Sequence, residues 1–282
     1  IWDGARWAED STLHVFDLAR AICRYKSFTC SNEMRIAKAL ASAQTVAAVE
    51  RLAKSDRAIA ATTDDWDRDE WLLNTPAGII DLTTGELGPH RRDALMTKLT
   101  AVSPEGECPL WITFLERVTG ADVELQAYLK RLVGYALTGS TREHVLPFAY
   151  GTGANGKSVF INTVAGILGD YHKTAPIETF TLSSHERHPT ELAGLRGARL
   201  VTATETEEGR RWAESRIKAL TGGDTISARF MRQDFFEYRP TFKLFVAGNH
   251  KPGLRSVDEA IRRRFNLIPF AVTIPEHERD DT

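Results

Sequence analysis

The eight residues GTGANGKS, 151–158, constrain this chain more than any other stretch, because they put three glycines and then a lysine between two apolar segments. Residues 145–150 predict a buried strand, and residues 157–168 have the apolar spacing of a helix. Glycine has no Cβ atom, so backbone N–H groups can close on an anion, and the helix N-terminus adds partial positive charge. The order of strand, loop and helix therefore predicts a phosphate-binding loop.

The spacing also fits the pattern G-x-x-x-x-G-K-[ST], in which the lysine contacts the β- and γ-phosphates of a nucleotide and the serine binds Mg²⁺. We expect an exposed Lys157 in the first role and Ser158 in the second. A chance glycine-rich turn is the alternative, and the flanking strand and helix disfavour it. The residues expected at the nucleotide are Gly151, Gly153, Ala154, Asn155, Gly156, Lys157, Ser158 and Val159.

The composition is that of an ordinary soluble globular protein of one large domain or two smaller ones, with 282 residues, 42% hydrophobic and 26% charged. No apolar run approaches the ~20 residues of a membrane span, so we expect no membrane partner. The net charge of −2 means that nucleic-acid binding requires a local basic surface. A first residue of Ile1 in place of Met suggests a fragment of a longer protein.

The cysteines and histidines form no pattern of metal ligands. Cys23, Cys30 and Cys108 are odd in number and contain no C-x-x-C pair, which indicates a reduced, cytoplasmic setting. His185 and His188 form an H-x-x-H pair, but no cysteines or further ligands lie at suitable spacing. We interpret that pair as part of a solvated loop.

The first half of the chain is expected to be mostly helical. Apolar spacing predicts helices over residues 11–25, 31–54, 109–118 and 121–137. The first two begin with a serine that can cap them. Residues 71–87 alternate short β-type runs with glycine-containing turns, which predicts a hairpin or small sheet.

From residue 145 onward strands and helices alternate, which predicts an α/β core. We place a domain boundary near residue 140, so that residues 1–140 form a mostly helical N-terminal domain with a small hairpin. Residues 141–282 then form the α/β domain that holds the phosphate-binding loop.

Two strand ends in this second half carry polar side chains suited to phosphate chemistry. Residues 199–204 predict a strand that ends at Glu205, where an acid could bind Mg²⁺ and polarise water. The alternative is the acidic start of a solvated helix. Residues 242–247 predict another strand, followed by Asn249, whose amide could orient the attacking water or sense the γ-phosphate. The alternative there is an ordinary asparagine turn.

Basic residues lie in two further places. Residues 225–231 and 235–238 predict a hairpin with Arg232 and Gln233 at its tip. Three consecutive arginines, Arg262 to Arg264, precede a final apolar run. Such a run is usually solvated or faces DNA, and one member could act as an arginine finger on a neighbour's nucleotide.

Taken together, these segments resemble the superfamily 3 helicases, most of all the phage and plasmid primase–helicase family related to the poxvirus primase–helicase. GTGANGKS resembles the family's Walker A motif, ARLVTATETEE its Walker B motif, and FKLFVAGNHKP its motif C. IKALTGGDTISARFMRQDFFEY resembles the segment with the DNA-contacting hairpin, and RRRFNLIPF the arginine-finger segment. LLNTPAGIIDLTTGEL is similar to the domain that precedes the helicase core, so the resemblance spans nearly the whole chain.

The resemblance implies a P-loop, AAA+-like α/β core and a ring of six copies that moves on single-stranded DNA with ATP and Mg²⁺. It implies phosphate contact by Lys157, metal binding by Ser158 and Glu205, and the sensor role for Asn249. Thr206 separates Glu205 from Glu207, so either acid could activate water. It implies that Arg264 is the arginine finger, with Arg263 as the second candidate. It also implies DNA contact by Arg232, Gln233 and Lys218.

The resemblance also implies DNA replication of a phage, prophage or plasmid in the cytoplasm of a bacterial host, in a family that often carries a primase domain on the same chain. Two other functions stay open. One is a replication initiator that uses ATP to assemble on DNA without unwinding it. The other is a P-loop kinase for a small molecule, which would need a substrate lid but neither the hairpin nor the Asn249 strand.

Overall fold

The computed structural model describes residues 1–30, 32–182, 190–205, 211–250 and 258–278. The chain packs as two compact units. The first unit consists of Ile1–Arg68 with His90–Thr97, and the second of Asp69–Pro89 with Lys98–Thr282. His185, His188, Glu207, Glu208 and Ser31 lie outside the described residues.

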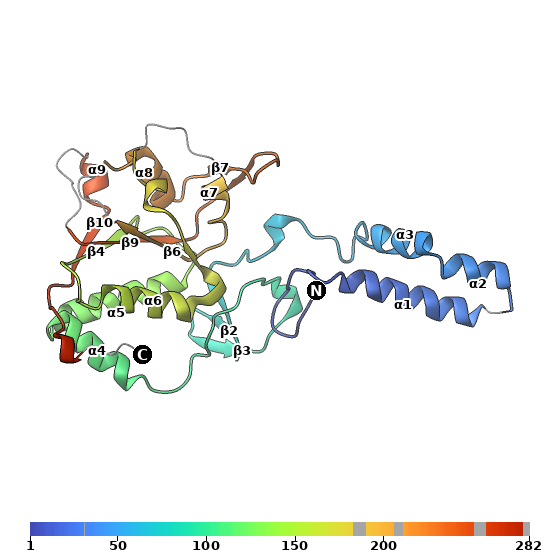
Figure 1. Cartoon of the computed structure of the whole chain (residues 1–282), viewed down its shortest axis with the longest axis horizontal. Coiled ribbons are helices and arrows are strands. Elements are labelled where there is room, and N and C mark those ends of the chain that lie inside the picture. The colour runs from blue at the N-terminus through green and yellow to red at the C-terminus, as the bar shows by residue number, and fades with distance from the viewer. Residues whose placement is uncertain (31, 183–189, 206–210, 251–257, 279–282) are drawn as a thin grey trace. The chain divides into compact units, whose positions relative to one another are not determined.

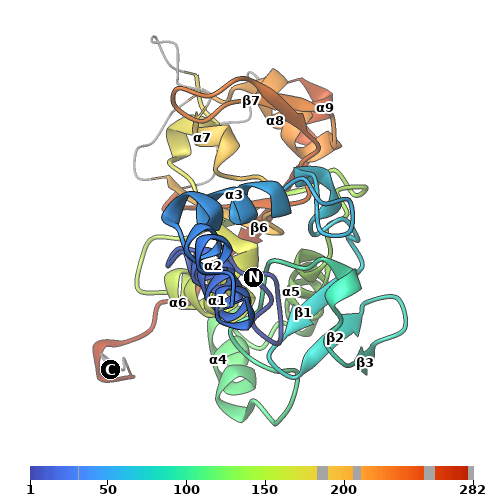
Figure 2. The ribbon, with the colours of Figure 1, turned by 90° about the vertical axis from the view of Figure 1, so that its right-hand side faces the viewer.

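The first unit is a helical arm whose helices are α1 (His14–Thr29), α2 (Met34–Leu40) and α3 (Ala43–Ala53), which Figures 1 and 2 show from two sides. Its buried core consists of Ala19, Cys23 and Val46. The short 3-10 helices of this unit are Thr63–Asp65 and Arg92–Ala94. The predicted helical character of the first half is confirmed in this arm.

Two helix predictions in the arm need correction. Ser11 does not cap α1; instead the carboxylate of Asp10 accepts hydrogen bonds from the backbone N–H groups of His14 and Val15, each at 2.8 Å. The continuous helix predicted over residues 31–54 is two helices in the structure. The break lies at Ser42, whose hydroxyl accepts from the backbone N–H of Thr45 at 3.2 Å and so begins α3.

The second unit is built on a five-stranded parallel sheet in the order β10-β4-β9-β6-β5. Its strands are β4 (Leu146–Tyr150), β5 (His172–Thr174), β6 (Leu200–Glu205), β9 (Lys243–Gly248) and β10 (Phe265–Pro269). The strand predictions are therefore confirmed to within about one residue for β4, β6 and β9, and the apolar run after the arginines forms β10; the fold is α/β as expected.

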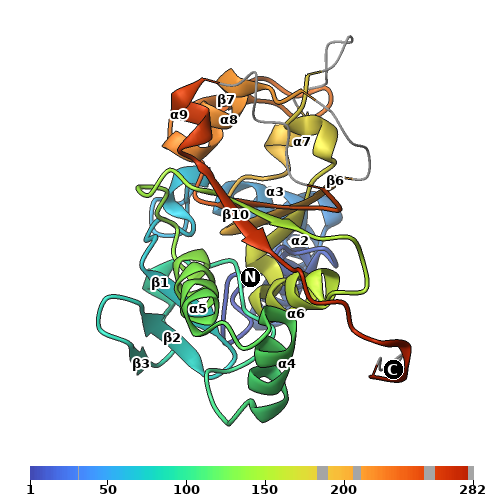
Figure 3. The ribbon, with the colours of Figure 1, turned by 90° about the vertical axis from the view of Figure 1, so that its left-hand side faces the viewer.

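Helices cover both faces of this sheet (Figures 1 and 3). One face packs on α4 (Pro109–Thr119), α5 (Val123–Leu137) and α6 (Lys157–Leu168), the other on α7 (Thr190–Ala193), α8 (Glu214–Gly222) and α9 (Glu259–Arg262). Successive strand residues point to opposite faces, so Phe148 belongs to one core and Ala149 to the other. Because both faces are covered, all six residues of β9 are buried, and those after Lys243 are apolar.

A second, antiparallel sheet packs in the same unit. Its strands are β1 (Leu72–Thr75), β2 (Gly78–Asp81) and β3 (Glu86–Gly88), which confirms the small sheet predicted from the turn residues. The remaining elements are the hairpin β7 (Ile226–Ala228) and β8 (Phe236–Tyr238), and the 3-10 helices Gly169–Tyr171, Ile177–Thr179 and Glu276–Glu278. The predicted boundary near residue 140 stays a prediction; by packing alone, α4 and α5 group with the five-stranded sheet.

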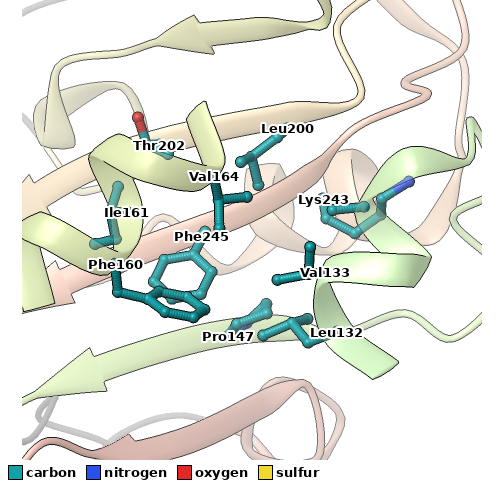
Figure 4. A pocket seen from close by; sticks show the side chains of 11 residues that line it. Leu132, Val133, Pro147, Phe160, Ile161, Val164, Leu200, Thr202, Lys243 and Phe245 are labelled. Atoms are coloured by element: carbon teal, nitrogen blue, oxygen red, sulfur yellow. The ribbon is translucent and has the colours of Figure 1, made fainter. Parts of the chain in front are cut away.

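A small apolar cavity of about 10 Å³ lies between α5, α6 and the sheet, and Figure 4 shows the side chains around it. Phe160 and Phe245 line one side and Lys243 the other. A cavity needs roughly 10–15 Å³ and polar partners to hold one water molecule, so this space is a packing gap and not a ligand site. In the described part of the chain, no helix is long and apolar enough to cross a bilayer.

Candidate functional site

Three strand ends meet at one level on the carboxyl edge of the sheet. Gly248, the last residue of β9, pairs with Tyr150 at the end of β4 on one side and with Glu205 at the end of β6 on the other. Parallel strands lie ~4.8 Å apart, so the backbones of Tyr150 and Glu205 are roughly 10 Å from each other. The chain segments that follow these three ends therefore share one edge, where α/β proteins bind ligands.

The loop after β4 has the torsion angles that its glycines were expected to permit. Gly151 has φ of 156° and Gly156 has φ of 80°. A Cβ atom on Gly151 would lie 2.2 Å from the carbonyl oxygen of Phe270, and one on Gly156 would lie 2.5 Å from Cγ1 of Val118. Both positions thus exclude a side chain by space as well as by torsion angle. The loop ends directly at the N-terminus of α6.

Lys157 is the first residue of α6, and its side chain is buried with 7% of its surface exposed. The expectation of an exposed lysine is wrong. Its Nζ donates to the carbonyl oxygen of Gly151 at 2.6 Å and to Oδ1 of Asn155 at 3.1 Å. Burial lowers the pKa of the Lys157 ammonium from its ordinary value. The loop itself therefore holds this amine in place.

Asn155 joins this lysine to the segment after β10. Its Nδ2 donates to the carbonyl oxygen of Phe270 at 2.9 Å, while its Oδ1 accepts from Lys157. The side chain is buried, with 3% exposed. The loop makes a second contact with the same segment, because the backbone N–H of Ile274 donates to the carbonyl oxygen of Ala154 at 2.7 Å.

A cavity of about 350 Å³ opens beside this loop. Eight residues predicted for the nucleotide site line it, namely Gly153, Ala154, Asn155, Gly156, Lys157, Ser158, Val159 and Asn249. The backbone of Glu205 ends the strand whose previous residue, Thr204, also lines the cavity. Ile161, Asn162, Thr204, Ala247 and Gly248 complete the lining and were not predicted. Helical spacing from Ser158 to Asn162 could have indicated that the first turn of α6 faces the cavity.

The predicted DNA-contact residues lie away from this cavity. Arg232 and Gln233 are exposed in the turn between β7 and β8, and Arg232 has φ of 61°. Lys218, on α8, forms an ion pair with Asp258. Asp258 also caps α9, because its Oδ1 accepts from the backbone N–H of Ile261 at 2.9 Å.

The arginine run lies at the amino edge of the sheet. The backbone N–H of Leu146, which begins β4, donates to the carbonyl oxygen of Arg264 at 2.6 Å. The side chain of Arg264 donates from Nε to Oγ1 of Thr221 at 3.0 Å and from Nη1 to the carbonyl oxygen of Ala260 at 2.7 Å. Arg263 is exposed, and its side chain has no hydrogen bond or ion pair to any residue that the structure describes.

Two family models match the chain over separate segments. The first, described as "D5 N terminal like", matches residues 1–120. The second, a family of unknown function numbered 5906, matches residues 149–264, which include the loop and all three strand ends.

Viral relatives of this chain carry the name "Putative helicase". One from Acanthamoeba polyphaga mimivirus is 28% identical over 75% of this chain and 23% of its own length. One from Frog virus 3 is 29% identical over 54% of this chain and 16% of its own length. One from Invertebrate iridescent virus 3 is 28% identical over 53% of this chain and 16% of its own length. The chain thus spans less than a quarter of the length of these relatives.

Among solved structures, the apo A form of the NrS-1 C-terminal region aligns with a TM-score of 0.46 at 15% identity, over 64% of this chain and 42% of that one. A version limited to residues 305–718 of NrS-1 aligns with the same TM-score at 16% identity, over 71% of this chain and 53% of that one. The D5-type N-terminal match and the viral helicase relatives are similarities over parts of the chain. Together they support a relation to the D5-like primase–helicases.

Proposed function

We propose that this chain is the ATP-hydrolysing motor of a DNA helicase that translocates on single-stranded DNA. The observation that carries the proposal is the common level of three strand ends, with the glycine loop, Asn249 and the backbone of Glu205 at one edge. Phosphoryl transfer to water needs phosphate binding, an acid and a polar group that orients water, all at one site.

The cavity is suited to ATP as substrate and to Mg²⁺ as its ion. Loop N–H groups and the N-terminus of α6 favour anionic oxygens, and Lys157 supplies a positive charge. Ser158 lines the same cavity, so its hydroxyl could bind Mg²⁺ together with Glu205 from β6. The ion would neutralise phosphate charge, while Asn249 would orient the attacking water.

The position of the arginines supports an oligomeric ring. Arg263 and Arg264 precede β10, whereas the glycine loop follows β4, its parallel neighbour. Five strand residues separate the two edges by about 13 Å, at ~3.3 Å per residue. These arginines would therefore act on the nucleotide of an adjacent copy, in a ring that we propose to be hexameric.

Two measurements test the proposed function. ATP hydrolysis should rise on addition of single-stranded DNA, and the protein should displace one strand of a forked duplex in the presence of ATP. Hydrolysis without strand displacement would indicate an initiator that uses ATP only to assemble. Hydrolysis that ignores DNA, with phosphate transferred to a small molecule, would indicate a kinase. Lys157→Ala is the negative control for both measurements.

The cellular setting belongs to the same proposal. Replication of phage, prophage or plasmid DNA in a bacterial host, and a primase domain on the same chain, would suit a D5-like motor. The viral relatives suit replication of viral DNA equally well. Single-stranded DNA is the partner in each case.

A further inference from the structure

The guanidinium of Arg264 is held by two groups of the same chain. Its Nε donates to Oγ1 of Thr221 at 3.0 Å, and its Nη1 donates to the carbonyl oxygen of Ala260 at 2.7 Å. Because the guanidinium is planar, bonds to two of its nitrogens fix the direction of the third, Nη2. No group that the structure describes accepts a hydrogen bond from Nη2, so this nitrogen is available to a ligand.

Thr221 offers its acceptor in a fixed orientation. It lies at the end of α8, is buried with 4% exposed, and donates its hydroxyl proton to the carbonyl oxygen of Ile217 at 2.7 Å. A hydroxyl has a single proton, so this donation leaves only lone pairs for Arg264. The hydroxyl cannot rotate away from Arg264 without losing its bond to Ile217.

A second contact connects α8 with α9 beside the start of β10 (Figures 1 and 3). Lys218 lies three residues before Thr221, on the same side of α8, and forms an ion pair with Asp258. Asp258 also caps α9, the helix that supplies the carbonyl oxygen of Ala260. The ion pair thus helps to hold together the two helices that anchor Arg264.

A glycine leaves the space beside Nη2 clear. Gly222 follows Thr221, and a Cβ atom on it would lie 3.8 Å from Nη2 of Arg264. The same point lies 3.7 Å from Nδ1 of His144 and 3.8 Å from Oδ2 of Asp224. Any side chain at this position would rest against Nη2, so glycine keeps that nitrogen uncovered.

We infer that Thr221 positions the arginine finger: its hydroxyl holds Arg264 so that Nη2 can reach the γ-phosphate of ATP bound in an adjacent copy. A finger stabilises the charge of the transferring phosphoryl group, and a displacement of about 1 Å can cost ~10²-fold in rate. An arginine that is already held also loses less side-chain entropy when it binds. This inference rests on the proposed function.

Thr221→Val tests this role, because valine has nearly the same shape but no hydroxyl. We expect kcat for ATP hydrolysis to fall by roughly 10- to 100-fold, the cost of a misplaced catalytic group. The affinity for a non-hydrolysable ATP analogue should not change, since the glycine loop of the variant is intact. Thr221→Ser keeps the hydroxyl and should hydrolyse ATP at close to the wild-type rate.

Mixing two variants assigns the loss to the finger. Each Thr221→Val copy has an intact glycine loop, and each Lys157→Ala copy has an intact finger. In an equal mixture with subunit exchange, about a quarter of the interfaces combine the two, so hydrolysis should rise several-fold above the sum of the separate proteins. A threonine that only stabilised its own chain would give no such recovery.

Thr119→Val is the matched control. The hydroxyl of Thr119, on α4, donates to the carbonyl oxygen of Leu115 at 2.7 Å and accepts from Nε2 of Gln126 at 3.1 Å, which is the same pattern of bonds. This variant should also lose stability in urea denaturation, but it should keep the wild-type kcat. If circular dichroism shows that Thr221→Val does not fold, Thr221→Cys replaces it, because a thiol is only a weak acceptor.

Three outcomes overturn the inference and leave the proposed function standing. The first is a wild-type kcat for Thr221→Val. The second is a lowered kcat that mixing with Lys157→Ala does not restore, although the same mixing restores Arg264→Ala. The third is wild-type hydrolysis by Arg264→Ala itself, which would show that Arg264 is not the finger. If the wild type hydrolyses no ATP with or without single-stranded DNA, the proposed function and the inference fail together.

Discussion

The side-chain amide of Asn155 donates a hydrogen bond to the carbonyl oxygen of Phe270 at 2.9 Å, although 115 residues separate the two in sequence. Asn155 also accepts from the ammonium of Lys157 at 3.1 Å. The buried side chain of Asn155 thus connects the Lys157 ammonium, which we expect at the phosphates, with Phe270, the residue directly after β10. We interpret Asn155 as a residue that positions Lys157.

Asn155→Asp should uncouple these contacts. The carboxylate cannot donate to Phe270, and its negative charge should hold the Lys157 ammonium away from phosphate. We expect kcat for ATP hydrolysis to fall by roughly 10²-fold, the size expected for a misplaced catalytic group. The unsatisfied carbonyl should cost about 1–3 kcal/mol of stability, measurable by urea denaturation. Asn162→Asp adds the same charge to the cavity without contacting Phe270, so its effect on kcat should be smaller. Equal effects would contradict the positioning role.

Lys157→Ala should abolish ATP hydrolysis, because no other group of the loop offers a positive charge to the phosphates. Since Lys157 is buried with two hydrogen bonds, the variant should also lose about 1–2 kcal/mol of stability. Circular dichroism should show an intact fold at room temperature. Hydrolysis at the wild-type rate would exclude the glycine loop as the phosphate site.

Arg264→Ala and Arg263→Ala, the variants of the two candidate arginine fingers, should differ in the free energy of unfolding as well as in ATP hydrolysis. Arg264→Ala removes hydrogen bonds to Thr221 and Ala260 and should lower the free energy of unfolding, whereas Arg263→Ala should not. Each variant is then mixed with Lys157→Ala protein. A finger that acts on a neighbour should restore hydrolysis, because about a quarter of randomly mixed interfaces are intact and a finger is worth ~10³–10⁵ in rate. No rescue by either arginine variant, with subunit exchange demonstrated, would contradict action across an interface.

Arg232→Ala should weaken binding to single-stranded DNA and lower the slope of log K against log salt by about one, because one phosphate contact is lost. ATP binding should not change. An unchanged slope for Arg232→Ala would transfer the phosphate contact to other residues, with Gln233 and Lys218 the next to test.

Lys243 predicts a pH-dependent stability that has nothing to do with the nucleotide. It begins β9, is buried, and donates to the carbonyl oxygens of Thr138 and Ser140 at the end of α5. Burial, and then the neighbouring charge of Arg199, hold the pKa of its ammonium well below the ordinary value of 10.5. Between the lowered and ordinary pKa values, the folded state binds fewer protons than the unfolded chain, so stability should increase with pH.

Urea denaturation from about pH 6 to about pH 9 tests this slope. Lys243→Met should lower the free energy of unfolding, because two carbonyls lose their donor, and should flatten the dependence of that free energy on pH. Lys173→Met, at an exposed position on β5, should leave the slope unchanged. Parallel curves for wild type and Lys243→Met would show that this amine does not titrate in that interval.

The sequence alone determined the parts of this protein that depend on neighbours along the chain. Glycine spacing predicted positive φ at Gly151 and Gly156, and apolar runs predicted β4, β6 and β9. The break at Ser42 was also local, since a serine hydroxyl that bonds the backbone three residues ahead competes with a continuous helix. Sequence analysis missed it because alanine and leucine continue the helical spacing across the break.

Only the tertiary structure decided which distant groups meet. Sequence spacing cannot show that Gly248 pairs with both Tyr150 and Glu205, because strand order depends on how the whole sheet assembles. The burial of Lys157 and its link through Asn155 to Phe270 likewise depend on a segment that returns more than a hundred residues later. Local propensity fixes torsion angles within a turn or two, whereas contacts of this kind form only when burial of both sheet faces brings remote strands into register.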